Sequence, residues 1–334
     1  MRPATGERAG VIALVDLGAT PPALRPAGPE LCRPPAPGEP FRWLDVDLSH
    51  PGGAEAVSEA FGIHPLALED VREQGQRQKL ERYRNHLFIS VREPRGDPHE
   101  PHPEELFLAA GPGWAVTFHA GREDWVREVA ARVATRADLD QNGGMAVAAA
   151  LLDQVVDGLE GLLDHLEEEV AAQEEAALES RRGDPVPSLR RASVIRYRVS
   201  RVRREAGQLR ELVGALVRVE LGNREHTDEL DLELRDVADH VQRALDDLGV
   251  LHDRMTALAE TRLALVAYRQ NEITKRLSAW GAILLVPTVV TGWFGMNFRH
   301  LPALASPAGP ILTFAGILGA CLILVAVFRR SGWL

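Results

Sequence analysis

The sequence predicts an α/β domain at the N-terminus, then a long helical stalk and two transmembrane helices at the C-terminus. Residues 1–145 are rich in proline and glycine, which separate short β-like runs. No proline occurs between Pro187 and Pro287, although the chain has 22 prolines. Residues 273–334 contain no Asp or Glu, so all 48 acidic residues lie upstream. These contrasts divide the chain into a water-facing region and an apolar C-terminal region.

The N-terminal domain is expected to alternate strands and helices over residues 1–145. Helices are predicted at 53–61, 65–74 and 124–136. Strand-like runs of apolar and β-branched residues occupy 11–17, 42–48, 86–93, 104–110 and 114–119. This alternation is typical of a compact α/β domain.

Residues 146–226 are predicted to form two amphipathic helices that pack on the stalk. The first, at 146–178, is rich in acids, and the second, at 188–218, is strongly basic. The stalk helix is expected over 227–276, where apolar residues recur every three or four positions from Leu234 to Leu258. Without a proline to stop it, this helix is expected to continue into the membrane, and seventy residues span roughly 100 Å.

Two uncharged segments near the C-terminus are long enough to cross a bilayer. Residues 277–298 are predicted as transmembrane helix 1 and 310–328 as transmembrane helix 2, joined by an outer loop at 299–309. A bilayer core of about 30 Å needs about 20 apolar residues of helix. The alternative is two buried helices of a soluble core.

Basic residues flank both segments on one side. Lys275 and Arg276 precede the first segment, and the tail 329–334 begins with Arg329 and Arg330. Basic flanks stay inside, so we expect a multi-pass protein of the inner or plasma membrane with both termini cytoplasmic. Residues 1–10 show no signal-peptide core.

Two membrane helices per chain cannot enclose an aqueous path, so transport would require several chains around an axis. The stalk periodicity continues into the membrane as one face with polar and small residues interrupted by a leucine. This face suits a pore with polar stations and a hydrophobic constriction, or else it packs helices together. Its members are Asn271, Thr274, Ser278, Gly281, Leu285 and Thr288.

Acidic side chains upstream could hold hydrated divalent cations between subunits, or could form a solvated helix face. The candidates are Asp236, Asp239, Asp246, Asp247 and Glu260. The segment 97–105 (DPHEPHPEE), which begins with Asp97, mixes acids with histidines and fits either a transition-metal site or an exposed loop.

Several classes of activity have no support in the sequence. Cys32 and Cys321 lie far apart with no CxxC pattern, so neither a disulfide nor a thiolate metal site is expected. There is no Gly-rich phosphate loop, nucleophile elbow or HExxH motif, so we expect neither an enzyme nor an ATP-driven pump. No cofactor is expected besides a divalent cation as substrate and regulator, and no nucleic-acid partner.

The tripeptide Gly295-Met296-Asn297 ends the first membrane segment about forty residues from the C-terminus. Together with segments 64–71, 76–92, 234–241 and 269–278, it resembles the CorA-type divalent cation transporters, with the ZntB-like zinc transporters as a neighbouring branch. The resemblance implies a funnel-shaped homopentamer in the lipid membrane, with a cytoplasmic α/β domain and a pore lined by transmembrane helix 1. It further implies passive transport of Mg²⁺, and often Co²⁺ or Ni²⁺.

The resemblance also implies roles for individual residues. Gly295, Met296 and Asn297 would form the outer mouth, where Asn297 holds a hydrated ion. Asn271 would form an inner polar ring, followed by Thr274, Ser278 and Thr288 along the pore. Leu277 and Leu285 would act as hydrophobic gates. Asp236 falls at the regulatory position, where intracellular Mg²⁺ bridges subunits, and Asp97 and Glu260 are further regulatory candidates.

The sequence departs from the family pattern just beyond the tripeptide. The outer loop carries Arg299 and His300, and Ala303 stands where family members often have an acid. Arg299 would repel a cation, and histidine suits Zn²⁺, Co²⁺ or Ni²⁺. Three hypotheses therefore stay open: a Mg²⁺ channel, a Zn²⁺ transporter, and a membrane-anchored sensor or scaffold that conducts nothing.

Overall fold

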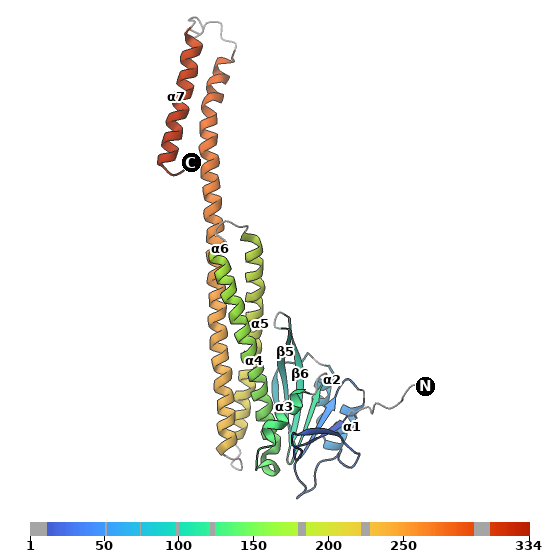
Figure 1. The fold of residues 1–334 in the computed structure, drawn as a ribbon. Coiled ribbons are helices and arrows are strands. Elements are labelled where there is room, and N and C mark those ends of the chain that lie inside the picture. The colour runs from blue at the N-terminus through green and yellow to red at the C-terminus, as the bar shows by residue number, and fades with distance from the viewer. Residues whose placement is uncertain are drawn as a thin grey trace, which may run out of the picture. The chain divides into compact units, whose positions relative to one another are not determined.

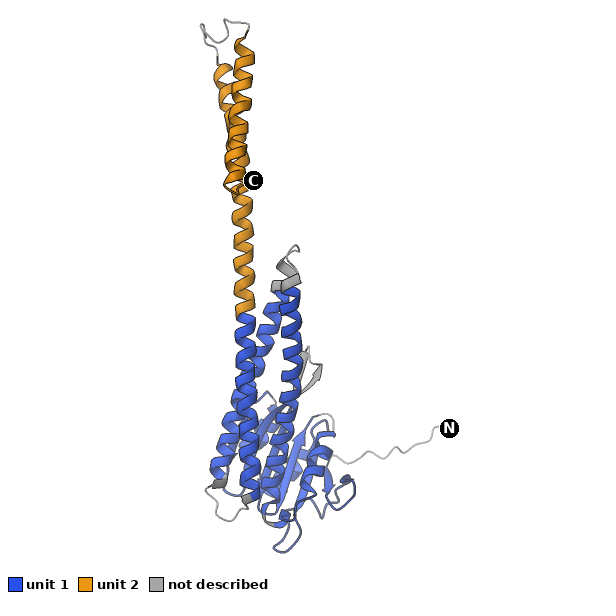
Figure 2. Cartoon of the chain, turned by 60° about the vertical axis from the view of Figure 1, so that its left-hand side comes forward, with its two compact units in different colours: residues 1–179, 190–256 blue, residues 180–189, 257–334 orange. Residues whose placement is uncertain are grey.

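A computed structural model describes residues 12–50, 52–73, 75–97, 100–120, 124–179, 185–221, 228–296 and 308–334. The chain divides into two compact units (Figure 2). Unit 1 comprises Met1–Glu179 and Arg190–Thr256, and unit 2 comprises Ser180–Leu189 and Ala257–Leu334.

The N-terminal part of unit 1 is built on a seven-stranded sheet in the order β2-β1-β3-β7-β6-β5-β4 (Figure 1). The β3–β7 pair is parallel and every other neighbouring pair is antiparallel. The strands are β1 (Ile12–Asp16), β2 (Ala23–Pro26), β3 (Arg42–Asp47), β4 (Lys79–Arg82), β5 (Leu87–Asp97), β6 (Glu100–Gly111) and β7 (Trp114–His119).

Helices cover both faces of this sheet because its central strands are apolar on both sides. One face packs on α1 (Gly53–Phe61) and α2 (Pro65–Glu73), in a core that includes Val46, Phe61 and Phe118. Alternate residues of the same strands point the other way. There His119 of β7 contacts the ring of Trp125 on α3 (Asp124–Val133), and α4 (Leu139–Glu179) packs on β5, β6 and β7.

The rest of unit 1 is a helical bundle formed by α4, α5 (Pro185–Leu221) and the first part of α6 (Asp228–Phe294). The apolar stripe predicted from spacing is buried from Leu234 to Met255. Polar side chains join the helices at their margins: Glu160 and His240 form a hydrogen bond at 2.8 Å, and the ion pairs are Glu169–Arg198 at 2.5 Å and Glu174–Arg254 at 2.7 Å. Unit 2 contains the remainder of α6 and α7 (Gly309–Arg330).

Differences from the expected elements are local. The short strands β2 and β4 were not predicted, and α4 begins at Leu139, seven residues before the helix expected from 146. The expectation of an exposed loop over 97–105 is wrong for its described residues, because the β5–β6 ladder continues to the pair Asp97–Glu100. In its outer part, where residues 92–97 of β5 pair with residues 100–105 of β6, this ladder is a two-stranded ribbon that pairs with neither β4 nor β7. Prolines fit there, since its outer edges donate to no further strand.

Candidate ion pathway and regulatory site

Unit 2 is a pair of apolar helices. Both α6 and α7 are long and apolar enough to cross a membrane by length and composition, with mean hydropathy of 1.6 and 2.7 in their most apolar windows. Ala279 and Ile283 of α6 are buried, which marks the face of this helix that packs on α7. Further along that face, Val290 and Phe294 line an apolar cavity of about 250 Å³ together with the start of α7.

The polar stripe predicted from spacing lies on a different face of α6. At 100° per residue, its average direction is roughly 150° from the face of Ala279 and Ile283. All six members are exposed in the single chain: Asn271, Thr274, Ser278, Gly281, Leu285 and Thr288. The packing of α7 on α6 therefore leaves this stripe available to a cavity or to another chain.

Two threonines of the stripe have fixed hydroxyl groups. Thr274 Oγ1 donates to the carbonyl of Gln270 at 2.9 Å, and Thr288 Oγ1 donates to the carbonyl of Leu284 at 2.8 Å. A hydroxyl group has one hydrogen to donate and two lone pairs that accept. Because the hydrogen is directed to the backbone, the oxygen presents acceptors outward, which suits the water shell of a cation.

Leucines interrupt the polar stations. Leu285 lies within the stripe and is 59% exposed, and Leu277 lies beside Ser278 and is 72% exposed. Rings of such side chains around an axis would form hydrophobic constrictions.

The tripeptide predicted for the outer mouth is described only in part. The amide of Gly295 donates to the carbonyl of Thr291 at 2.9 Å, and the amide of Met296 donates to the carbonyl of Trp293 at 3.3 Å. A Cβ at Gly295 would lie 3.2 Å from the Thr291 oxygen, so this turn favours glycine. Asn297, with Arg299, His300 and Ala303, lies outside the described residues.

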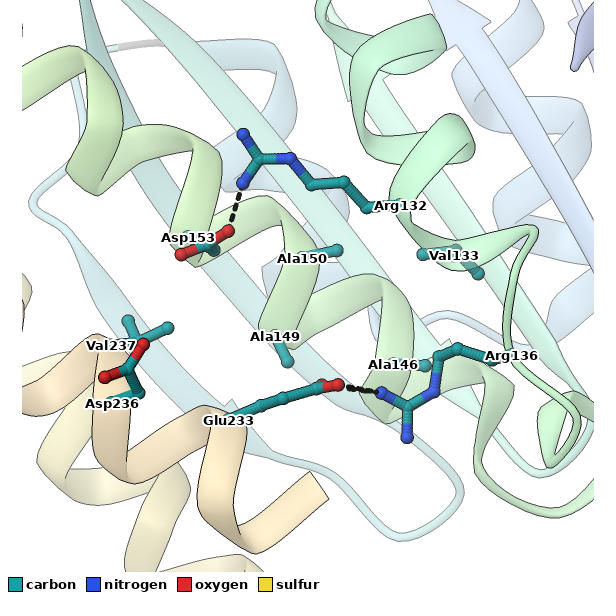
Figure 3. A pocket seen from close by; sticks show the side chains of 10 residues that line it. All are labelled: Arg132, Val133, Arg136, Ala146, Ala149, Ala150, Asp153, Glu233, Asp236 and Val237. Carbon is teal, nitrogen blue, oxygen red and sulfur yellow. Dashed lines mark hydrogen bonds and ion pairs between the residues drawn. The ribbon is translucent and has the colours of Figure 1, made fainter. Parts of the chain in front are cut away.

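The predicted regulatory residue Asp236 lines a separate cavity of about 240 Å³ in unit 1 (Figure 3). It is 3.7 Å from the ring of His240, and its side chain is 71% exposed. The cavity also contains Asp153 of α4, which is paired with Arg132, and Glu233 of α6, which is paired with Arg136 at 2.6 Å.

The two arginines set the electrostatics of this cavity. Burial raises the pKa of Asp153, and the positive charge of Arg132 only partly offsets this increase. Arg136 also binds Asp138, whose pKa its hydrogen bond lowers to about 2. The carboxylates of Asp153 and Glu233 are thus neutralised within the chain, whereas Asp236 has only a histidine beside it among the described residues.

Two of the three regulatory candidates are far apart along the same helix. Asp236 and Glu260 are 24 residues apart on α6, about 36 Å at the rise of an α-helix. Asp97 ends the β5 strand of the sheet, and its side chain is not described. Among the described residues, no group of three His, Cys, Asp or Glu side chains is placed to hold a metal ion.

Sequence reasoning missed Arg132 and Arg136, which lie at and after the end of α3. No local pattern marks them, because their carboxylate partners on α4 and α6 are brought near only by the fold.

The α/β domain, the helical bundle and the two membrane-length helices define a membrane protein. The chain belongs to the CorA-like Mg²⁺ transporter family, whose sequence profile matches residues 38–330. This confirms the resemblance inferred from the motifs.

Individual relatives agree with this assignment. The chain is 27% identical over 298 residues to the cobalt/magnesium transport protein CorA of Thermotoga maritima, covering 87% of this chain and 83% of the relative. It is 26% identical over 197 residues to the zinc transport protein ZntB of Pectobacterium atrosepticum, covering 57% and 55%.

The fold agrees with a solved structure of the CorA magnesium transporter from Methanocaldococcus jannaschii. The TM-score is 0.78 at 18% identity, covering 97% of this chain and 99% of that one. The predicted fold class, an α/β domain followed by a long helix and an apolar C-terminal helix, is therefore confirmed.

Proposed function

We propose that this chain forms a homopentameric, gated pore that carries divalent cations passively across the membrane, with hydrated Mg²⁺ as the leading substrate and Co²⁺ and Ni²⁺ as further ions. The observation that carries the proposal is the polar stripe of α6, which is exposed and faces away from α7. Family membership and the CorA relative of Thermotoga maritima, named for cobalt and magnesium, support the choice of ions.

A ring of chains accounts for the stripe physically. Oxygen-bearing side chains facing lipid would gain nothing, because lipid offers no hydrogen-bond partner. Around a symmetry axis, the same side chains line an aqueous path, and α7 of each chain lies on the lipid side.

The chemistry of the stripe suits an ion that keeps its water. Mg²⁺ dehydrates reluctantly, so neutral oxygens that contact its shell are better placed than a cage of carboxylates. In this proposal Gly295, Met296 and Asn297 form the outer mouth, and Asn271, Thr274, Ser278 and Thr288 form polar rings. Leu277 and Leu285 close the path between conducting events by excluding water.

We further propose that intracellular Mg²⁺ inhibits the pore through Asp236, with Asp97 and Glu260 as further candidate ligands. The neighbouring Arg132 and Arg136 already neutralise Asp153 and Glu233, so Asp236 is the cavity carboxylate left to face another subunit. An ion between two subunits would hold the ring shut, and its loss would leave like charges facing each other.

In the proposed orientation the protein lies in the inner or plasma membrane, and both of its termini are in the cytoplasm. Lys275 and Arg276 precede the apolar part of α6, and Arg329 and Arg330 end α7. These basic flanks are the inner side by the positive-inside rule.

Zn²⁺ is the second candidate substrate. His300 and Arg299 occupy the outer loop in place of an acid, and the ZntB relative is named for zinc. A basic mouth disfavours the simple electrostatic capture of Mg²⁺, while an imidazole ligand suits Zn²⁺.

The deciding experiment is an ion-flux assay with the purified full-length protein in proteoliposomes. Mg²⁺, Co²⁺, Ni²⁺ and Zn²⁺ are compared singly and in competition. Saturable Mg²⁺ flux blocked by Co²⁺ supports the leading assignment, and flux of Zn²⁺ alone supports the second candidate. Absence of flux for all four ions would favour the non-conducting sensor or scaffold.

A further inference from the structure

The outer face of α5 carries a row of arginines without ion-pair partners among the described residues. Arg196, Arg203 and Arg210 are exposed, recur every seven residues, and make no ion pair with any described residue. Two of them, with Arg204, line an open groove of about 780 Å³ between α5 and α6. Asp246 of α6 is the only carboxylate among the residues of α5 and α6 that line this groove.

The outer face of α4 carries the opposite charge. Asp157, Asp164, Glu168 and Glu175 are exposed and lie within about 40° of one another around the helix, at steps of seven and four residues. This face points away from the buried apolar side of α4, which includes Leu159, Leu166 and Val170. Asp157 is paired with Arg132, and the other three have no ion-pair partner among the described residues.

Each charged face contains a glycine. Gly161 lies between Asp157 and Asp164, and Gly207 lies between Arg203 and Arg210. A Cβ at either glycine would have no atom of a described residue within 4 Å, so the packing of these residues gives no reason for a glycine. Each costs the helix about 1 kcal/mol relative to alanine, and a close helix–helix approach from outside would explain both.

The two faces also match in height along the bundle. Helices α4 and α5 are antiparallel neighbours (Figure 1), and the ion pair Glu169–Arg198 fixes their register. Five residues before Glu169 is Asp164, and five residues after Arg198 is Arg203, so these two lie level to within about one helical turn. A further seven residues along each helix reach Asp157 and Arg210.

From these observations we infer that the acidic face of α4 in one copy docks against the basic α5–α6 groove of the next copy in the ring. This inference rests on the proposed oligomer. Cyclic symmetry brings each neighbour to the same height without translation, and it joins two different surfaces of the same chain. The acidic face of α4 and the basic groove are different surfaces of the chain, and their opposite charges lie at equal heights. They therefore meet both conditions, and the glycine on each side allows a close approach.

Charge pairs at such an interface set the orientation of the subunits more than their affinity. Exposed ion pairs contribute little individually and weaken with salt, while like charges brought together oppose the wrong arrangement. The interface therefore selects which face of one stalk meets the next.

The test uses the full-length protein in proteoliposomes, with Cys32→Ser and Cys321→Ser as background. Asp164→Cys with Arg203→Cys is oxidised and run on a non-reducing gel. We expect a ladder of covalently linked copies, whose yield falls at high salt. In the control pair, Glu175→Cys with Arg203→Cys, the cysteine on α4 lies about 16 Å along the helix from position 164. This pair should give no ladder.

A second arm tests the charges with Gly161→Cys and Gly207→Cys as the cross-linking pair. R203E/R210E should lower the ladder several-fold, and adding D164R/E168R should restore it. The matched control R82E/R84E, which reverses two exposed arginines near strand β4, should leave the yield unchanged.

Cation flux measured on the same vesicles separates this inference from the proposed function. Intact flux without a ladder, or a cross-link confined to the monomer band, would overturn the interface and leave the pore standing. Loss of flux for all ions in the background protein, with no oligomer detected, would overturn both.

Discussion

Cys321 of α7 approaches the backbone carbonyl of Ile283 on α6, with 3.7 Å between Sγ and the carbonyl oxygen. That carbonyl is four residues before Pro287, which has no N–H to complete the helical hydrogen bond. The thiol thus supplies a weak donor from the neighbouring helix. In an apolar surrounding a free carbonyl is costly, which explains a polarisable cysteine in this position.

The first prediction follows from this contact. Cys321→Ser, with a stronger donor, should preserve the stability of the α6–α7 pair, and Cys321→Ala should lower the unfolding free energy by about 1 kcal/mol. Thermal unfolding of the full-length protein in detergent measures both, and Cys32→Ala is the matched control outside unit 2. Equal midpoints for the Ser and Ala variants would show that the contact contributes nothing.

The second prediction concerns the outer mouth. Asn297→Ala should abolish cation uptake into proteoliposomes, because a methyl group cannot hydrogen-bond to the water shell of an ion as an amide can. The oligomer should persist on size exclusion. Leu312→Met, which keeps volume and apolar character at an exposed position of α7 outside the proposed pathway, is the control and should retain flux. Uptake at the unmodified rate in Asn297→Ala would remove this residue from the pathway.

The third prediction concerns feedback. Asp236→Ala should weaken the inhibition by internal Mg²⁺, raising the concentration needed for half-inhibition several-fold without changing the maximal flux. Asp239→Ala removes a nearby exposed carboxylate of α6 outside the cavity and should leave inhibition unchanged. An identical inhibition curve for Asp236→Ala would reject this residue as the sensor.

Much of the fold was predictable because its signals are local and strong. Trp114–His119 was predicted as a strand with its observed bounds, and the stripe from Leu234 to Met255 is buried as its spacing indicates. The short strands β2 and β4 were missed because four residues carry little pattern and their pairing is decided by neighbours distant in sequence. The exposed polar stripe on α6 was also predictable, since helical spacing alone places its members together.

The cavity around Asp236 was not predictable in the same way. Arg132 and Arg136 reach it only after α3, α4 and α6 pack, so nothing local in their sequence marks them. The same holds for the contact of Cys321 with Ile283, which joins residues 38 positions apart.

The last prediction concerns pH and His86, which is only 4% exposed. Its Nδ1 is 2.9 Å from Asn85 Oδ1, and its Nε2 has no hydrogen-bond partner among the described residues. Burial, with the charge of His64 as a smaller cause, lowers the pKa of His86 from 6.5 to about 4. Between these values the unfolded chain binds a proton that the folded chain does not, so the unfolding free energy falls as pH decreases through this window.

The loss at pH 4 relative to pH 8 should reach at most about 3 kcal/mol from this residue. His86→Phe keeps a ring in the stack beside Tyr83 and removes the titration, so it should flatten the slope of unfolding midpoint against pH between 4 and 6.5. A slope that survives His86→Phe would assign the acid sensitivity to other groups, because His86 can then no longer bind the proton.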